Sequence, residues 1–357
     1  MSESQGKLSI IKVAAWLFVI VLVFYLLIVG QRFLIPILVA IFIWNLLNTL
    51  NDGIKRLPTV GVFLPNAISR LLSLLVVAGL ISMLVNIIGD NVTDVMGASA
   101  RYQHNLKQIL SQVNQKDLAK FASGFDQFLG ELNLQGIILG VYSMFTRIAG
   151  SAVIIGLYIV FLFVEQRVVQ QKLSVLFPQA EHRQLMDSMI LHIGKDVQAY
   201  LGLKSLMGLL TAVASWGIMK AVGLDFAEFW ALLIFFLNYI PNIGAIIATL
   251  FPALLALIQF QLWWPFVLMT SGLVIVQFII GNLIEPRYLG RSLNLSPLVI
   301  LVALALWGEI WGVFGMFLAV PITVILMIIF AHFDATRSLA VVLSQDGQIK
   351  KSYRSLT

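Results

Sequence analysis

The sequence contains no cysteine and very little charge. The absence of cysteine excludes disulfides, thiol catalysis and cysteine-ligated zinc or iron–sulfur centres. Only 11% of the 357 residues are charged and 60% are hydrophobic, whereas a soluble domain has about 25% charged residues. Together with a mean hydropathy of +0.95, this composition predicts a multi-span, all-α membrane protein.

Sequence motifs of enzymes and of ATP-driven pumps are missing as well. The chain has no HExxH metalloprotease motif, no Gly-x-Ser-x-Gly elbow and no Walker A loop. Its net charge of +6 is spread over loops between apolar runs, without the interleaved aromatic and basic residues of a nucleic-acid surface. We therefore expect no enzyme activity, no cofactor, no metal site and no nucleic-acid partner.

Several apolar runs are long enough to cross a membrane. A bilayer of about 30 Å needs roughly 17 to 25 helical residues, and such runs occupy residues 13–29, 33–50, 71–88, 148–164, 205–222, 262–284 and 310–331. Lys7 and Lys12 precede the first run but no small-residue cleavage site follows it, so we interpret it as a retained anchor. Lys and Arg gather on the loops that face inward when the amino terminus is cytoplasmic, which predicts that both termini are cytoplasmic.

Two polar segments interrupt the apolar runs. Segment 90–147 is rich in Gln and has apolar residues three and four apart, which predicts amphipathic helices that cap the outer face. Segment 166–204 is more basic and is expected along the inner membrane surface. The predicted organisation begins with N-terminal membrane helices (1–89) and a polar extracytoplasmic insert (90–147). A membrane helix with a cytoplasmic amphipathic segment (148–204), a transport core (205–331) and a cytoplasmic tail (332–357) follow.

The stretch LNYIPNIGAIIATLFP, residues 237–252, places two Asn, two Pro and one Gly inside an apolar region. These residues interrupt helical hydrogen bonding, and lipid offers no water to the backbone groups that are freed. The apolar arm before the break, residues 229–237, would be about 14 Å long at 1.5 Å per residue. We therefore expect a broken hairpin at residues 226–260 that enters from outside and breaks near mid-membrane. The alternative is a proline kink that binds nothing.

A second break is predicted at WGEIWGVFG, residues 307–315. The arm before it, residues 298–306, is equally short, and the hairpin at residues 297–331 is expected to start and end inside. Two broken hairpins that enter from opposite sides form an inverted repeat, the arrangement that builds secondary-transporter sites. The predicted fold class is therefore an all-α, polytopic helical membrane protein with two oppositely entering broken helical hairpins and a polar amphipathic-helix insert.

The segments NYIPNIGAIIATLFPALLAL, GNLIEPRYLGRSLNLSPLVI and WGVFGMFLAVPITVIL, with SLAVVLS in the tail, resemble the AI-2E family, the bacterial autoinducer-2 exporter family. The resemblance is close over residues 197–344 and rests elsewhere on hydropathy and loop lengths. It implies a homopentamer in the bacterial inner membrane, whose two helical hairpins hold the substrate and whose protomers each work by an elevator-like movement. Characterised relatives export autoinducer-2, a small hydroxylated quorum-sensing signal, whereas others resemble sodium (lithium)/proton antiporters, so both activities stay open.

Carried onto this sequence, the resemblance places substrate-binding residues at the first hairpin tip, namely Asn238, Tyr239, Pro241, Asn242 and Gly244. Amide and phenol groups exchange hydrogen bonds with hydroxyls without requiring a charge, which suits a polyol. The alternative for both asparagines is that they cap the two half-helices.

The segment GNLIEPR contributes Asn282 and Glu285 to the expected substrate site. They lie three residues apart, hence on one helix face, from which they can close the inner end of the site. The alternative for Glu285 is a salt bridge to Arg287 or Arg291 that fixes the helix end.

The second hairpin tip contributes Gly308, Glu309 and Gly312. Glu309 is the only ionisable residue between Arg291 and His332, and a carboxylate near mid-membrane is expected either to titrate or to bind a cation. The glycines permit close backbone approach. If the hairpin crosses the membrane fully, Glu309 lies at the outer interface and has no such role.

These patterns favour a secondary transporter whose partners are a small polar solute or a monovalent cation, and membrane lipid. A membrane scaffold or sensor without flux is the alternative of another class. Two polar hairpin tips argue against that alternative, because a scaffold has no need of them.

Overall fold

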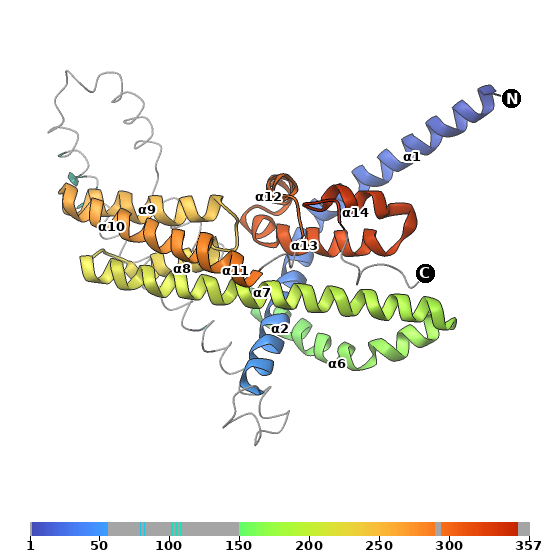
Figure 1. The fold of residues 1–357 in the computed structure, drawn as a ribbon, viewed down its shortest axis with the longest axis horizontal. Helices are drawn as coiled ribbons and strands as arrows, with labels where there is room; N and C mark the ends of the chain where they lie inside the picture. Colours follow the sequence, from blue (N-terminus) through green and yellow to red (C-terminus); the bar gives the residue numbers. More distant parts are fainter. Residues whose placement is uncertain are drawn as a thin grey trace. The chain divides into compact units, whose positions relative to one another are not determined.

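The structure, a computed structural model, describes residues 2–55, 79, 82, 101–102, 104–105, 108, 150–289 and 294–348 (Figure 1). Its α-helices are α1 (Ser2–Val29), α2 (Gln31–Lys55), α6 (Ala152–Leu176), α7 (Ala180–Val222), α8 (Ala227–Leu237), α9 (Ile243–Phe260), α10 (Trp263–Gln277), α11 (Glu285–Leu289), α12 (Pro297–Trp311), α13 (Val313–His332) and α14 (Arg337–Leu343). A π-helical turn, η1 (Phe278–Ile284), and a 3-10 turn, η2 (Asp334–Thr336), complete the regular structure of the described residues. The predicted all-α class is confirmed.

The described helices include enough long apolar segments for a multi-pass membrane protein. Five are long and apolar enough to cross a membrane, and a sixth span results if the bent helix α6 counts as one. Four of the five overlap most of a predicted run; the fifth is α9, which the sequence predicted only as the arm of a hairpin. The predicted run 71–88 and most of the polar insert 90–147 lie outside the described residues.

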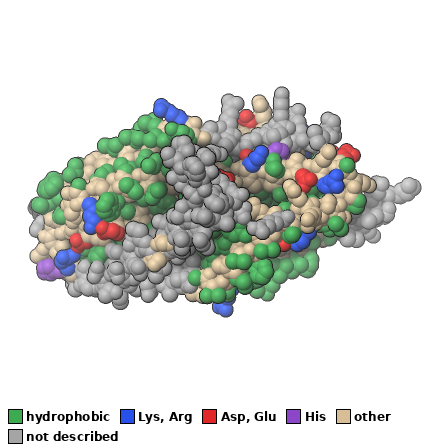
Figure 2. All heavy atoms as spheres, turned by 90° about the horizontal axis from the view of Figure 1, so that it is seen from below, with side chains coloured by type: hydrophobic (Ala, Val, Ile, Leu, Met, Phe, Trp, Pro, Cys, Tyr) green, Lys and Arg blue, Asp and Glu red, His purple; other side chains and the backbone are tan. Residues whose placement is uncertain are grey.

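Large apolar side chains cover much of the surface of these helices. The side chains of Leu17, Phe18, Val21 and Val29 on α1 are 58% to 68% exposed. Figure 2 shows the same pattern over one face, where hydrophobic side chains spread widely among few charged ones. A water-soluble monomer rarely exposes apolar surface on this scale. Lipid is the solvent in which this surface is stable.

The chain divides into two compact units. The terminal unit comprises Met1–Trp44, Ile154–Gly194 and Asn294–Thr357, and the central unit comprises Asn45–Val153 and Lys195–Leu293. Helices α2 and α7 each continue from one unit into the other. The pair α8–α9 belongs to the central unit and the pair α12–α13 to the terminal unit.

In the terminal unit, α12 packs against α13, and α14 folds back onto α13. Helix α1 contacts α12, where the Trp311 indole N–H donates to the Leu27 carbonyl at 3.0 Å. The backbone N–H of Ser296 donates to the Leu343 carbonyl at 3.0 Å and that of Gln345 donates to the Asn294 carbonyl at 3.1 Å, so the end of α14 and the residues after it are held against the segment that precedes α12.

In the central unit, α8, α9 and α10 lie beside the C-terminal half of α7 (Figure 1). Fully buried Phe229 and Trp230 of α8 form the core with Met219 of α7 and Met269 of α10. The Trp230 ring stacks on Phe251 of α9 with a centroid distance of 6.3 Å. This packing holds the break between α8 and α9 against α7.

Each of the two helix pairs has a glycine just beyond its break. A Cβ added to Gly244 would lie 1.8 Å from the Leu237 carbonyl oxygen, and one added to Gly315 would lie 1.7 Å from the Trp307 carbonyl oxygen. No larger residue fits at that distance. The second helix of each pair can therefore fold back over the end of the first only because glycine occupies this place.

The two breaks differ in how well the sequence located them. The first lies where it was predicted, since α8 ends at Leu237 and α9 begins at Ile243. The second begins later than predicted, because α12 continues through Trp307 and Gly308 and ends at Trp311. Gly308 keeps helical geometry, and the chain turns at Gly312, which has φ of +62°. With 15 residues, α12 is about 22 Å long, more than half a bilayer.

Candidate functional site

The break between α8 and α9 is tied to α7 by polar side chains. The Asn238 amide Nδ2 donates to Thr211 Oγ1 at 3.1 Å, and the Tyr239 hydroxyl shares a hydrogen bond of 2.6 Å with Ser205 Oγ. Lys204 Nζ donates to the Asn238 carbonyl at 3.2 Å. Backbone groups freed at the end of α8 thus find partners inside the protein, as an apolar environment requires.

The Lys204 ammonium also forms an ion pair with the Glu285 carboxylate. The two side chains are only 7% and 13% exposed. Glu285 is the first residue of α11, directly after the π-helical turn η1, and π-helical turns are frequent at functional sites. Burial makes each charge costly without the other, so the pair links α7 to the end of the α10–α11 segment.

The structure corrects the predicted alternative for Glu285. Its partner is Lys204 of α7, whereas the sequence suggested Arg287 or Arg291. The Arg287 side chain is exposed, and Arg291 lies outside the described residues. Asn238, Tyr239 and Glu285, three of the residues expected in the site, are therefore brought together through α7.

The other residues expected in this part of the site are arranged differently. Asn242 is exposed and has φ of +60°, and its side chain makes no capping hydrogen bond; Asn282 is exposed as well. Asn238 does not cap either helix with its side chain, because that side chain reaches Thr211. Pro241 and Gly244 shape the turn through their backbone.

The second helix pair places its expected residues in the terminal unit. Gly308 faces Met316 closely, since an added Cβ would lie 2.8 Å from Met316 Cε. Glu309 is exposed and has no hydrogen bond or ion pair to another described residue. Gly312 provides the turn.

Sequence reasoning missed the contribution of α7. Lys204, Ser205 and Thr211 all contact the break, but Lys204 was assigned to a basic inner-surface segment. A signal was present, because Tyr200, Lys204 and Thr211 are spaced by four and seven residues, which puts them on one face of a helix. Polar residues at that spacing in an apolar helix mark a face that packs inside protein.

The chemistry available in this cluster is hydrogen bonding without net charge. The Lys204–Glu285 pair is neutral as a unit, and amide, phenol and hydroxyl groups surround it. No group of three or more potential metal ligands occurs among the residues that the structure describes. Such a set can recognise a small polar solute.

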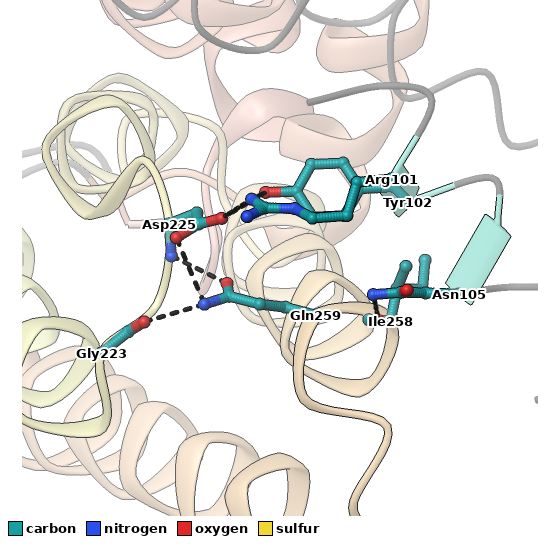
Figure 3. Close-up of polar contacts among 7 residues, drawn as sticks. All are labelled: Arg101, Tyr102, Asn105, Gly223, Asp225, Ile258 and Gln259. Carbon is teal, nitrogen blue, oxygen red and sulfur yellow. Dashed lines mark hydrogen bonds and ion pairs between the residues drawn. The ribbon is translucent and has the colours of Figure 1, made fainter. Parts of the chain in front are cut away.

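A second polar cluster joins the described residues of the insert to the loop between α7 and α8 (Figure 3). Arg101 forms an ion pair with Asp225, and the Tyr102 hydroxyl donates to Asp225 Oδ2 at 2.7 Å. The Gln259 amide donates to the Gly223 carbonyl at 2.9 Å and accepts from the Asp225 backbone N–H at 2.8 Å. Burial raises the pKa of the Tyr102 hydroxyl, and its hydrogen bond to Asp225 raises it further. This cluster fixes the loop to the end of α9.

The fold and the polar cluster define a polytopic α-helical membrane protein with a broken helix pair and buried polar groups at the break, features that secondary transporters share. The family model described as AI-2E family transporter matches residues 17–335. The chain therefore belongs to the AI-2E family of transporters.

Individual relatives match over most of their length. The AI-2 transport protein TqsA of Escherichia coli K12 is 28% identical over 326 residues, which cover 88% of this chain and 91% of TqsA. The protein YhhT of the same organism is 27% identical over 320 residues, or 87% of each chain. A protein of Borreliella burgdorferi is 30% identical over 262 residues, or 71% of this chain and 70% of the relative.

Proposed function

We propose that this protein is a secondary transporter that exports a small, neutral, hydroxylated solute such as autoinducer-2 across the bacterial inner membrane. The observation that carries the proposal is the buried, net-neutral polar cluster at the break between α8 and α9, formed by Asn238, Tyr239, Lys204 and Glu285. The relative TqsA, an AI-2 transport protein that aligns with 88% of this chain, supports the choice of solute.

Flux through the purified full-length protein in liposomes tests the proposal. We expect autoinducer-2 to cross these membranes faster than it crosses protein-free liposomes. We expect Asn238→Ala to slow the flux and Asn242→Gly to leave it nearly unchanged, because only Asn238 is tied into the cluster. Glycine is the suitable control at position 242, since the native φ is +60°.

Two other outcomes would replace this proposal. Sodium, lithium or proton exchange without movement of autoinducer-2 would identify an antiporter instead. A folded, correctly inserted protein that moves neither solute nor cation would identify a scaffold or sensor.

We also propose, from the family resemblance, that the protein forms a homopentamer in which each protomer carries its substrate by an elevator-like movement. The mass of the detergent-solubilised complex tests the assembly. Mixed complexes that contain one active and several inactive protomers test independence, because flux should fall in proportion to the active fraction.

A further inference from the structure

Four polar residues form a buried stripe along one face of α7. Tyr200, Lys204, Thr211 and Ser215 are spaced by four, seven and four residues, which keeps them on the same side of the helix. Their exposed fractions are 3%, 6%, 0% and 0%. Most buried polar side chains in proteins are hydrogen-bonded, so one that has no partner calls for an explanation.

The hydroxyls of Tyr200 and Ser215 have no hydrogen-bond partner among the described residues, whereas Lys204 and Thr211 do, and of the two only Tyr200 is next to Lys204 along the stripe. Tyr200 lies four residues before Lys204 on α7, so the two side chains are neighbours on the same face of the helix, and this face carries the ion pair to Glu285. A buried hydroxyl without a partner is unfavourable. Tyr200 thus holds an unused donor and acceptor beside the cluster already described.

The ion pair next to Tyr200 has hydrogen-bonding capacity of its own. The Lys204 ammonium has three N–H donors, and its bonds to Glu285 and to the Asn238 carbonyl account for two. The Glu285 carboxylate has further lone pairs. Donors and acceptors therefore lie side by side while the total charge is zero.

This combination selects among solute classes. An anion would be attracted by Lys204 but repelled by Glu285, and a cation would meet the reverse, so neither gains from a pair whose charges cancel. A neutral solute with adjacent hydroxyls both donates and accepts at each hydroxyl, which matches the available groups.

We propose that Tyr200, together with the Lys204–Glu285 pair, forms a subsite that binds one end of a neutral solute through two adjacent hydroxyls. Tyr200 binds one hydroxyl directly, and the pair binds the other. This inference deepens the proposed function and rests on it for the transport step, but binding to the subsite can be tested without flux.

Tyr200→Phe is the sharpest variant, because it removes the hydroxyl and keeps the ring. Binding is measured by calorimetry on the purified full-length protein with autoinducer-2, with D-ribose as a second neutral compound with adjacent hydroxyls, and with 1,3-propanediol, whose two hydroxyls are not on adjacent carbons. We expect Tyr200→Phe to weaken binding of the first two by about 2- to 10-fold, the effect of one neutral hydrogen bond, and to leave binding of 1,3-propanediol nearly unchanged. Tyr25→Phe, at an exposed tyrosine of α1, is the matched control and should change none of them.

Thermal stability without ligand supplies the second measurement. The subsite predicts that Tyr200→Phe unfolds at the same or a higher temperature, since an unpaired buried hydroxyl has been removed. Unchanged affinity for all three compounds in this variant would overturn the subsite, even if the wild type transports autoinducer-2. So would tighter binding of inorganic phosphate or sodium than of any of the diols.

The subsite and the proposed function can fail separately. If the wild type binds D-ribose in a Tyr200-dependent way but neither binds nor moves autoinducer-2, the subsite stands and the proposed solute is wrong. If the wild type binds none of the neutral compounds, the subsite is wrong.

Discussion

The Lys204 ammonium is paired with the Glu285 carboxylate and also donates to the Asn238 carbonyl. One cation on α7 therefore holds two other segments, the break after α8 and the start of α11. Burying two charges costs several kcal/mol for each ion, which their attraction offsets only while both are present. This relationship makes the pair a sensitive point for stability.

Removing one partner of this pair should destabilise the protein strongly. We expect Glu285→Leu to lower the free energy of unfolding by about 3 to 5 kcal/mol, because Lys204 stays buried without its counter-charge. The double variant Lys204→Met with Glu285→Leu should recover most of that loss. Denaturation of the purified protein in detergent measures both.

The exposed pair Lys172–Glu165 on α6 is the matched control. Its nitrogen and oxygen lie 2.5 Å apart, but its side chains are 58% and 52% exposed. Glu165→Leu should therefore cost about 1 kcal/mol or less. Equal losses at positions 285 and 165 would contradict the buried character of the first pair.

The glycines beyond the two breaks should tolerate no side chain. Gly244→Ala and Gly315→Ala place a Cβ 1.8 Å and 1.7 Å from a carbonyl oxygen, so the turn must open or shift. We expect each to lower the free energy of unfolding by about 1 to 3 kcal/mol or more, as overpacking does. Gly217→Ala on α7, where no atom lies within 4 Å, should be neutral or stabilising by up to about 1 kcal/mol. Melting curves of the three variants compare them directly.

The sequence predicted local features of this fold well. Apolar runs located α2, the second half of α7, the α10–η1 segment and α13, because a membrane span is determined by composition over one continuous segment. The Asn, Pro and Gly residues of the stretch 237–252 located the first break to within two residues. The glycines at 308 and 312 predicted the position of the second break less well. Gly308 stays helical, and the chain turns only at Gly312, which adopts a positive φ.

Contacts between distant segments were less accessible to sequence reasoning. Glu285 has two arginines close by in sequence, yet it pairs with Lys204 of another helix. Lys204 itself stands at the end of a basic segment, so its charge suggested the membrane surface. Which basic residue pairs with Glu285 depends on how α7 packs against the break after α8. No local sequence pattern gives the distance between Lys204 and Glu285.

The Tyr102 hydrogen bond to Asp225 should persist over a wide pH range. The pKa of Tyr102 is raised in the folded protein, so its contribution is present below the ordinary tyrosine pKa of about 10 and is lost only as pH rises beyond it. We expect Tyr102→Phe to cost about 1 kcal/mol, with the same difference from wild type between about pH 6 and 9. A difference that disappears within this interval would contradict the assignment. The free energy of unfolding of the wild type and of Tyr102→Phe, measured at several pH values, tests this prediction.

Membrane topology can be tested by labelling, because the chain has no cysteine of its own. Cysteines are introduced one at a time at Gln112, Arg183 and Lys350. A membrane-impermeant thiol reagent should label position 112 from outside and positions 183 and 350 from inside. Reaction at position 112 only after the inner face is opened would contradict the predicted orientation. It would also reverse the sides from which the two broken hairpins are expected to enter.

A role of Asn238 in binding can be separated from a purely structural role at the first break. Asn238 donates to Thr211 and is held beside the ion pair, whereas Asn242 is exposed and its side chain makes no capping bond. If Asn238 contributes to a solute site, Asn238→Ala should weaken binding of autoinducer-2 by about 5- to 150-fold, equivalent to about 1 to 3 kcal/mol for a buried partner left unsatisfied. Asn242→Gly should change affinity little.

A purely structural role of Asn238 predicts the opposite result, a loss of stability without a loss of affinity. If Asn238 only stabilises the end of α8 through its hydrogen bond to Thr211, Asn238→Ala should cost about 0.5 to 1.5 kcal/mol of stability and leave the affinity of the folded protein nearly unaltered. Affinity and thermal midpoint are therefore measured on the same purified samples of both variants. A loss of stability at position 238 without a loss of affinity would remove Asn238 from the binding site and leave Tyr239 and the groups on α7 to form it.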